Sequence, residues 1–365
     1  MDNQTYFNQT SDWANFWIQA NSDNHNIHYI ETEYMSCYVF EYPFVMGKKF
    51  WYIPRGFSLK KPDVIKLLTN PSKNASGQNA LTDEIFVNIN LILEQVTAKA
   101  KLNPEIAFIK FEINEFLLKC IPVDDLNLKS LTKKLKDKTD LNLKLSNKKL
   151  QYLSTRLINL GEVQKLIGEN RVISDVIEDF WNNNQKWFTA NLDKRTRYGT
   201  RKALEYGWKI SWAKSKENFE AFYSLHQDTS IRQKFGIHGR EYLNTLFRLP
   251  FTKIVILRDK DENPQAAWLG IINQNSIIHL YGGNSQQSRE NYGQYMLNLA
   301  AVYIGSENNC HTLDLGGTEE GKGFDMFKKG YKGQEWNFYG PFDIVLDKWS
   351  YNLYHIARAV KELTK

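Results

Sequence analysis

Three strand-like runs follow one another between residues 251 and 284, and they constrain the fold more than any other feature of this chain. Their sequences are FTKIVILRD, PQAAWLGIIN and SIIHLYGGN, and only the short polar turns KDENP and NQN separate them. Runs rich in β-branched and aromatic residues with such short connections indicate neighbouring antiparallel strands. Two helical patterns precede the runs, and a helix, a strand, a helix and a strand follow them. This order predicts a mostly antiparallel sheet flanked by helices.

The amino-terminal half carries a second set of strands. HYIETEYMSCYVFEYPF and KKFWYIPRG are typical of strands, and EIAFIKFEI, residues 105–113, alternates as a strand does. Before it, Thr82 is placed to cap a helix that ends near Lys101, which gives a βαβ order. We therefore expect an α+β protein of two domains, 1–170 and 171–365, each with a mixed, mostly antiparallel sheet flanked by helices. The last helix, 349–364, is a candidate to pack back on the first domain.

Composition restricts the class of protein. Hydrophobic residues make up 42% and aromatic residues 14%, which is too much apolar matter for a disordered chain. Lys and Arg number 47 against 41 Asp and Glu, and the net charge of +6 suits phosphate-bearing partners. The three cysteines lie far apart, His25 and His28 lie in a polar loop without nearby cysteines, and the other five histidines are dispersed, so neither a disulfide framework nor a metal site is predicted. We expect a protein of the reducing cytoplasm.

The sequence predicts neither a secretory signal nor a membrane-spanning helix. The first residues, MDNQTYFNQTSDW, lack the basic and apolar regions of a signal peptide. No apolar run approaches the roughly 18 to 20 residues that a spanning helix needs. Any membrane contact is therefore expected to be peripheral, at the inner face.

Two segments are rich in basic residues. Residues 119–150 hold nine Lys against four Asp, and residues 186–216 hold nine Lys or Arg against two acids. In the second segment, Arg197, Arg201 and Lys202 are spaced to lie together on one helix surface. Such a surface can bind phosphates with a steep dependence on salt, whereas most charge runs are simply solvated. For residues 119–150 the open alternatives are a solvated surface and a contact with phosphate or anionic lipid headgroups.

The stretch 316–345 concentrates glycines, aromatic residues and lysines, and it is the predicted site of chemistry. The strand HTLDLGG ends in a Gly pair, and GFDMFKKGYKG predicts a short helix with Phe324, Phe327 and Tyr331 on one face. Lys328 lies next to that face. An amine held against an aromatic wall loses water and acts strongly on developing negative charge. The alternative is a helix whose lysines are merely solvated.

The order of elements in the second half is that of a Gcn5-related acyltransferase (GNAT) core, which invites a test for coenzyme A. The pyrophosphate loop of that fold resembles (Arg or Gln)-x-x-Gly-x-(Gly or Ala) at the start of a helix, where backbone N–H groups hold the phosphates. The corresponding stretch is SQQSRENYGQY, in which Arg289 and Gly293 are one residue too far apart. This spacing weakens the acetyl-coenzyme A hypothesis.

Several pieces together resemble the Fem-type (FemABX) peptidoglycan bridge aminoacyltransferases, which carry two GNAT-like domains and use aminoacyl-tRNA. The matching pieces are FWYIPRG, RYGTRKALEYG, HQDTSIRQKFGIHGREYL, LYGGNSQQSRENYGQYMLNLAAVYIG, LDLGG and MFKKGYKGQEWNFYGPFDIV. They occur in family order and span nearly the whole chain. Some members insert a long helical arm into the second domain, but residues 232–251 have room for only one short helix. The chain therefore resembles the armless form.

The resemblance implies an enzyme of cell-wall biogenesis. It would transfer an amino acid from its tRNA ester to the stem-peptide amine of a peptidoglycan precursor, either UDP-MurNAc-peptide or lipid II, with no cofactor besides aminoacyl-tRNA as co-substrate. Lys328, beside Phe327, matches the family's lysine that stabilises charge at the reacting carbonyl or binds the tRNA end. The other residues implied to bind substrate are Arg55, Gly56, Arg201, Lys202, Tyr281, Ser285, Gly316, Gly317 and Tyr339.

The sequence leaves open which group acts as the general base, and two other functions compete with aminoacyl transfer. Glu112, at the end of FIKFEI, matches an acidic position in the family, but Ile113 replaces the proline that often follows. A substrate phosphate or a tRNA hydroxyl is an alternative base, and Glu112 is then an ordinary surface carboxylate. Two other functions compete: a GNAT-fold N-acyltransferase that uses acyl-CoA or an acyl carrier, and a nucleic-acid-binding module without catalysis. The transferred amino acid, the form of the acceptor and the oligomeric state are not determined by the sequence.

Overall fold

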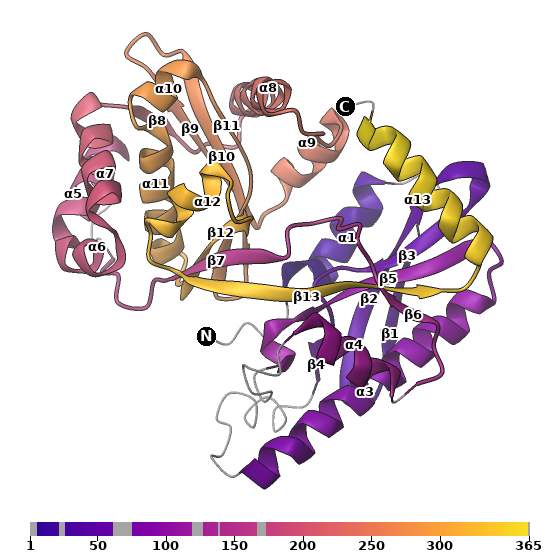
Figure 1. Ribbon diagram of the computed structural model, residues 1–365. Coiled ribbons are helices and arrows are strands. Elements are labelled where there is room, and N and C mark those ends of the chain that lie inside the picture. Colours follow the sequence, from indigo (N-terminus) through magenta and orange to yellow (C-terminus); the bar gives the residue numbers. More distant parts are fainter. Residues whose placement is uncertain are drawn as a thin grey trace. The chain divides into compact units, whose positions relative to one another are not determined.

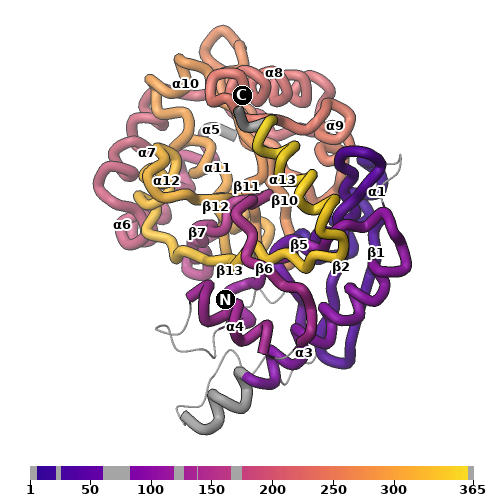
Figure 2. Tube along the Cα trace, turned by 45° about the vertical axis from the view of Figure 1, so that its right-hand side comes forward, coloured from indigo at the N-terminus to yellow at the C-terminus, as the bar shows by residue number. Residues whose placement is uncertain are grey.

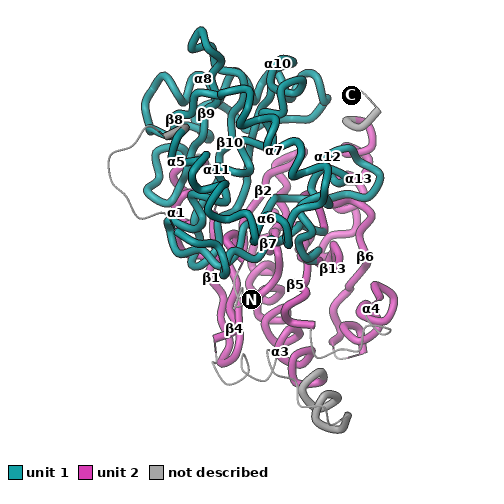
Figure 3. Tube along the Cα trace, turned by 90° about the vertical axis from the view of Figure 1, so that its left-hand side faces the viewer, with its two compact units in different colours: residues 1, 154–336 teal, residues 2–153, 337–365 magenta. Residues whose placement is uncertain are grey.

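The computed structural model describes residues 6–21, 26–60, 75–118, 127–137, 139–165 and 173–363 (Figure 1). The chain divides into two compact units (Figure 3). Unit 1 comprises Ser154–Trp336, and unit 2 comprises Asp2–Leu153 together with Asn337–Lys365. This grouping differs from the sequence-based division at residue 170, because the carboxy-terminal strand pairs with a strand of the amino-terminal segment, Phe342 opposite Phe111.

The sheet of unit 1 contains the three consecutive strands that the sequence predicted. β9 (Thr252–Arg258), β10 (Pro264–Asn273) and β11 (Ser276–Asn284) are antiparallel neighbours. The strand order is β7-β12-β11-β10-β9-β8, with β7 at Ser154–Asn159, β8 at Lys209–Ser211 and β12 at Thr312–Thr318. Only β11 and β12 run parallel, so the sheet is mixed and mostly antiparallel.

Helices flank this sheet, as expected. α11 and the group α5 to α7 lie on one side of the strands, and α8 and α9 lie on the other (Figure 1). The bounds are α5 Ile173–Asn183, α6 Gln185–Asn191, α7 Lys194–Tyr206, α8 Lys216–Gln233, α9 Arg240–Arg248, α10 Gln286–Glu290, α11 Gly293–Glu307 and α12 Gly323–Lys329. Between β8 and β9 the described chain contains only α8 and the short α9, so no long helical arm is present there.

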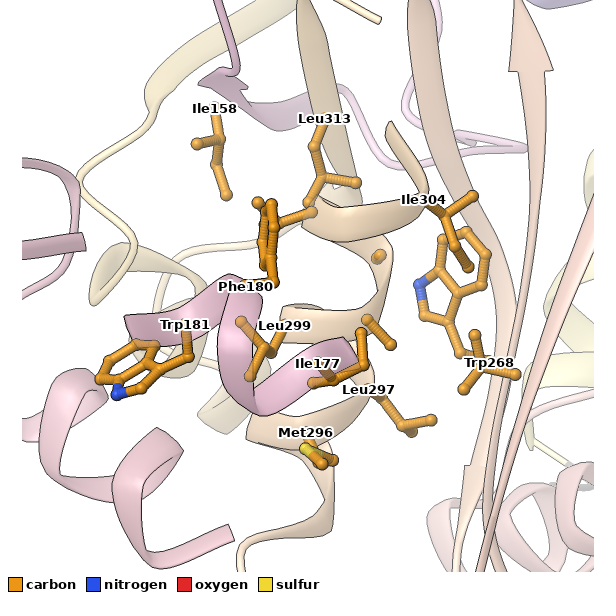
Figure 4. Close-up of a cluster of buried hydrophobic side chains, with 14 of the residues drawn as sticks. Ile158, Ile177, Phe180, Trp181, Trp268, Met296, Leu297, Leu299, Ile304 and Leu313 are labelled. Atoms are coloured by element: carbon orange, nitrogen blue, oxygen red, sulfur yellow. The ribbon is translucent and has the colours of Figure 1, made fainter. Parts of the chain in front are cut away.

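The core of unit 1 is built around α11, which is apolar on almost all sides and therefore buried. Leu297 and Leu299 of this helix belong to one buried cluster with Trp268 of β10 and Leu313 of β12 (Figure 4). Phe180 of α5 closes the far side of the helix (Figure 4). Each fully buried Leu or Phe side chain stabilises the fold by about 1.5 to 3 kcal/mol. This packing holds β11 and β12 in place, and these strands contribute His279, Asn284 and Leu315 to the candidate site.

The sheet of unit 2 has the order β1-β2-β3-β5-β13, while β4 pairs with β2 and β6 pairs with β13. The bounds are β1 Ile27–Glu31, β2 Met35–Pro43, β3 Lys49–Ile53, β4 Ser58–Leu59, β5 Ile106–Asn114, β6 Leu143–Leu145 and β13 Gln334–Val345. β3 and β5 run parallel, and α3 (Ala75–Lys101) connects them, which confirms the predicted βαβ order. Both sheets are mixed and mostly antiparallel, so the α+β class is confirmed.

The helical segments of unit 2 cover its sheet. They are η1 Phe7–Gln9, α1 Ser11–Ala20, η2 Val45–Gly47, η3 Glu115–Leu118, α4 Leu128–Lys136 and α13 Lys348–Leu363. α13 packs on β5 and η2 and lies beside the strands of unit 2 (Figure 2).

Two predictions for unit 2 concern α3 and the basic segment. α3 begins before Thr82, so its predicted start was wrong, but its predicted stripe of Ile85, Ile89 and Leu93 is buried. Part of the basic segment 119–150 lies outside the described residues; within α4, Leu131 and Leu135 face the interior.

None of the helices in the described parts of the chain combines the length and apolar character needed to cross a bilayer.

Candidate functional site

A cavity of about 370 Å³ lies in unit 1, where the ends of six elements meet. The elements are α8, β11, α10, α11, β12 and α12. Its lining residues are Arg232, His279, Asn284, Arg289, Gln294, Asn298, Leu315, Phe324, Phe327 and Lys328. The lining combines an aromatic wall with three cations and several amides. A cavity of this size and character suits a small polar group on an anionic carrier.

Lys328 reaches the cavity from α12 and is anchored by backbone oxygens. Its Nζ donates to the carbonyl oxygen of Gly316 at 3.0 Å and to that of Gly317 at 2.6 Å. The ammonium also lies 5.3 Å from the centre of the Phe324 ring. Burial lowers the pKa of Lys328 to about 8, although the nearby carboxylates of Asp314 and Asp325 favour the charged form. Lys328 therefore carries a proton at neutral pH in a poorly hydrated site.

The two carbonyl oxygens face Lys328 because β12 ends in a glycine turn. Gly316 has a φ of +78°, and a Cβ atom there would lie 3.0 Å from the carbonyl oxygen of His279. A side chain at this position would therefore meet backbone strain and a steric clash together. Asp314 accepts a hydrogen bond from the Gly316 N–H at 2.8 Å and so orders the turn. The Gly pair predicted at the strand end thus positions the acceptors of the lysine.

His279 of β11 lines the cavity beside Lys328. Burial lowers the pKa of His279 to about 3, and the positive charge of Lys328 acts in the same direction. The imidazole is therefore neutral at physiological pH. Its Nε2 lies 3.0 Å from the carbonyl oxygen of Tyr281. A group with so low a pKa is a poor proton acceptor, so His279 serves as a neutral wall of the site.

Phe327 supplies the apolar wall expected beside the lysine. Its ring packs edge-on against Tyr295 of α11, with centroids 5.0 Å apart, and against Tyr331, with centroids 5.5 Å apart. Tyr331 lies past the end of α12 and is buried. These rings hold α12 on unit 1, while the Phe324 ring of the same helix lies over the Lys328 ammonium.

Two arginines at the cavity were not predicted as site residues. Arg232, from the last turn of α8, and Arg289 of α10 both donate to the carbonyl oxygen of Asn284, at 3.0 and 3.1 Å. Burial lowers the pKa of Arg232, and the charge of Arg289 acts in the same direction. No spacing in the sequence signals this pair, because the two residues are 57 positions apart and meet only when α8 packs on β11. They form an anion-attracting rim.

Four other predicted residues of unit 1 do not line the cavity. Arg201 and Lys202 of α7 both pair with Glu205 of the same helix, at 3.7 and 2.6 Å. Ser285 caps α10, because its hydroxyl accepts from the Ser288 N–H at 3.0 Å. The ring of Tyr281 lies edge-on to His226 at 5.4 Å, in an aromatic cluster next to the cavity. Lys328, Phe327, Gly316 and Gly317 are the predicted residues that the fold brings together.

Three of the predicted residues of unit 2, Arg55, Gly56 and Glu112, are buried, and Tyr339 is partly buried. Glu112 is fully buried and accepts from the Tyr52 hydroxyl at 2.9 Å and from the Arg55 N–H at 3.0 Å. Burial raises the pKa of Glu112, although the charge of Arg55 opposes this. Glu112 is therefore not the surface carboxylate of the alternative interpretation, because Tyr52, which binds it, lies in the hydrophobic core. Its role as the general base stays a prediction.

Arg55 is buried as well, with only 6% of its surface exposed. Its guanidinium stacks 4.0 Å from the centre of the Phe338 ring and donates to the carbonyl oxygen of Tyr152. Gly56 follows with a φ of +91°, and a Cβ there would lie 3.0 Å from the Glu112 carbonyl oxygen. Tyr339 lies in β13, opposite Ile113. Arg55 therefore orders the end of β3, and its contact with a substrate stays a prediction.

The cavity of unit 1 can stabilise developing negative charge next to a cationic rim. Lys328 is a preorganised donor, His279 is neutral, and Arg232 and Arg289 attract anions. Within the residues that the structure describes, no group of three or more His, Cys, Asp and Glu side chains is placed to hold a metal ion.

The chain is similar to a known protein family and to several solved structures. A model of the FemAB family matches residues 175–257 and 248–359, which together make up half of the chain. The solved structure of FemX is 14% identical, with a TM-score of 0.65 and coverage of 96% of this chain and 95% of that one. The C-terminal domain of a putative lysylphosphatidylglycerol synthetase from Agrobacterium fabrum is 11% identical, with a TM-score of 0.53 and coverage of 96% and 92%. No curated protein sequence matches the chain.

Proposed function

Because the chain belongs to the FemAB family, we propose that it is an aminoacyltransferase that takes an amino acid from its tRNA ester. The acceptor is an amine on the stem peptide of a peptidoglycan precursor, either UDP-MurNAc-peptide or lipid II. Family membership supports the general activity, which is aminoacyl transfer in the building of peptidoglycan bridges. The use of tRNA and the nature of the acceptor are the finer parts of the proposal.

The observation that carries the proposal is the Lys328 ammonium, held by two carbonyl oxygens inside a cavity of about 370 Å³. In aminolysis the amine attacks the ester carbonyl carbon, and the carbonyl oxygen becomes an oxyanion. The C–O bond to the tRNA ribose then breaks, the ribose oxygen takes a proton, and an amide remains. A preorganised cation at the oxyanion lowers the barrier of such a step by roughly 2.7 to 4 kcal/mol.

The proton of the attacking amine needs an acceptor that this cavity does not provide. His279 is too weakly basic, and Glu112 is fully buried in the other unit. We therefore assign the proton transfer to the substrates themselves, through the ribose hydroxyl next to the ester or a phosphate. Because the ester is already activated, the proposed reaction needs no cofactor beyond aminoacyl-tRNA.

The alternative donor, an acyl-CoA or acyl carrier, is disfavoured by the segment that precedes α11. A pyrophosphate loop needs free backbone N–H groups. Here the Ser288 N–H binds the Ser285 hydroxyl, and the N–H groups of Asn291 and Tyr295 bind backbone oxygens at 3.0 and 2.9 Å. α10 thus occupies the place of an open loop.

We place the reaction in the cytoplasm, with a peripheral contact at the inner face of the membrane if the acceptor is lipid-linked. α13 supports such a contact, since Trp349 and Ile356 on its outer side are both 61% exposed. Lys144 lies next to this helix, with its Nζ 5.5 Å from the centre of the Tyr351 ring. Exposed apolar residues beside lysines suit an anionic bilayer surface.

The decisive experiment incubates the protein with pools of charged tRNA and, separately, with UDP-MurNAc-peptide and lipid II. Mass spectrometry of the stem peptide should show the mass of one added amino acid, and ribonuclease treatment should abolish it. Titration calorimetry with coenzyme A tests the alternative. Micromolar binding of coenzyme A, together with no gain in mass from any charged tRNA, would overturn the proposal.

A further inference from the structure

A second cavity in unit 1, of about 420 Å³, is lined mainly by cations and aromatic rings. It lies between the start of α8 and α9. Its lining residues are Lys214, Ser215, Lys216, Phe219, Glu220, Arg240, Asn244, Phe247 and Arg248. Four basic side chains thus face one acid. The rings of Phe219 and Phe247 are buried, with centroids 5.3 Å apart, and give the cavity a firm floor.

The basic side chains of this cavity are only partly neutralised. Arg240 pairs with Glu220 and lies 5.0 Å from the centre of the Tyr223 ring. Lys214 donates to the carbonyl oxygen of Leu249. Lys216 and Arg248 have no hydrogen-bond or ion-pair partner among the described residues. Two cations that a fold places at a cavity without partners attract an anion from outside.

A third cavity, of about 320 Å³, continues this surface, because Lys214 lines both. It adds Lys253 as a further cation and Glu307 as its acid. Trp212 and Tyr303 stack along it, with centroids 5.8 Å apart and an angle of 15° between the rings. Burial lowers the pKa of Lys214, and the charge of Lys253 acts in the same direction, so like charges are brought together here. The two cavities make one track with five cations and two acids, longer than a single phosphate needs.

α8 connects this track to the cavity of about 370 Å³ that contains Lys328, which we call the reaction cavity. Lys216 is the first residue of the helix and lines the cationic cavity, whereas Arg232 is in its last turn and lines the reaction cavity. Sixteen residues of α-helix separate them, or about 24 Å. A ligand that fills both sites must therefore carry negative charge far from its reacting end, as a tRNA does and a mononucleotide does not.

We propose that the cavities around Lys214, Lys216, Arg248 and Lys253 bind the phosphodiester backbone of the tRNA body, at a distance from the aminoacylated end. This proposal rests on the proposed function and adds the surface that holds the body of the donor. The sequence had indicated that phosphates bind to α7, and the present proposal assigns their binding to the cavities beside α8 and α9 instead. On α7, Arg201 and Lys202 pair with Glu205, whereas Lys216 and Arg248 are free of such pairs among the described residues.

The test compares the variant Lys216→Ala/Arg248→Ala with a control of equal charge change, Lys209→Ala/Lys260→Ala, whose lysines lie in β8 and in the turn between β9 and β10. Binding of uncharged tRNA is measured by filter retention over a range of salt concentrations. The double variant should bind roughly three- to tenfold more weakly, and the slope of log affinity against log salt should fall by about 2, one for each lost contact. The control should keep the wild-type slope.

A second readout uses a short aminoacylated acceptor-end fragment as the donor. The double variant should transfer from this fragment as fast as the wild type and lose efficiency only with full-length tRNA. Wild-type affinity and slope in the double variant would overturn this proposal while leaving the transferase activity in place. Tight binding of adenosine monophosphate that disappears in the double variant would also overturn it, in favour of a nucleotide pocket. Failure of the proposed function is distinct, because the wild type would then bind tRNA without transferring from it.

Discussion

The Nζ atom of Lys328 lies 2.6 Å from the carbonyl oxygen of Gly317, and this contact joins the short helix α12 to the glycine turn that ends β12. The lysine is thereby held in one position before any substrate arrives. Two of its three N–H bonds are directed at Gly316 and Gly317, which leaves one donor for a ligand. Such a preorganised donor has little reorganisation to undergo when charge develops.

Replacing Lys328 with Met should lower kcat/KM for aminoacyl transfer roughly 100- to 1000-fold, because the donor to the oxyanion is lost. The fold should persist, since Met keeps the length of the side chain and removes a buried charge. Lys329→Met is the matched control, because Lys329 is exposed and pairs with Asp325 at 2.8 Å. Steady-state kinetics and circular dichroism of both variants check this. Full activity of K328M would refute the role of the ammonium.

The activity should fall as the pH rises through about 8. The pKa of Lys328 is lowered to about 8, so the ammonium is present below that pH and lost above it. A profile of kcat/KM against pH reports this ionisation in the free enzyme. In Lys328→Arg, which stays protonated, any remaining activity should lack this falling limb. A limb unchanged in K328R would assign the ionisation to another group.

The free energy of unfolding should rise with pH above about 8, where the activity is expected to fall. The unfolded chain keeps the Lys328 proton up to the ordinary value of 10.5, whereas the folded chain releases it near 8. Between these values the unfolded state binds more protons, so the free energy of unfolding contributed by this group rises with pH. Urea denaturation at pH 7.5 and 10 should show this rise in the wild type relative to K328M.

Gly316→Ala should destabilise unit 1 by about 1 to 3 kcal/mol and reduce transfer, because φ is +78° and the added Cβ meets the His279 carbonyl oxygen. Gly321→Ala separates the two causes. Gly321 has a similar φ of +82°, but a Cβ there would have no neighbour within 4 Å. Thermal unfolding of both variants should show the larger loss for G316A, and only G316A should lose activity beyond its loss of folded protein.

Glu112→Gln should destabilise unit 2 by about 1 to 3 kcal/mol near pH 4.5 and leave transfer within about threefold of wild type. The pKa of Glu112 is raised by burial, so the folded chain holds its proton above the ordinary value of 4.5. The stability of the wild type relative to E112Q should therefore fall as the pH rises from 4.5. The exposed Glu105→Gln is the control. A loss of 100-fold or more in kcat with intact folding would restore Glu112 as a base.

Much of the fold could be predicted from local patterns. The run from Thr252 to Asn284 specifies three antiparallel strands through β-branched residues and short turns, and the structure has them. Lys328 and the Gly pair could be found because they are close in sequence, and a short helix returns the lysine to the strand end. Arg232 and Arg289 could not be found in this way, since each is an ordinary helix-end cation until α8 and α10 meet.

The sequence by itself determined the class of the fold, the order of its elements and the segment that carries Lys328, because periodicity, turn residues and glycine act over a few neighbouring positions. Only the tertiary structure decided which charged groups stay accessible. It buried Glu112 and Arg55 beside aromatic rings, paired the cations of α7, and left Lys216 and Arg248 at a cavity. Burial and pairing arise from packing between segments far apart in the chain, and these distances are not encoded in any local pattern.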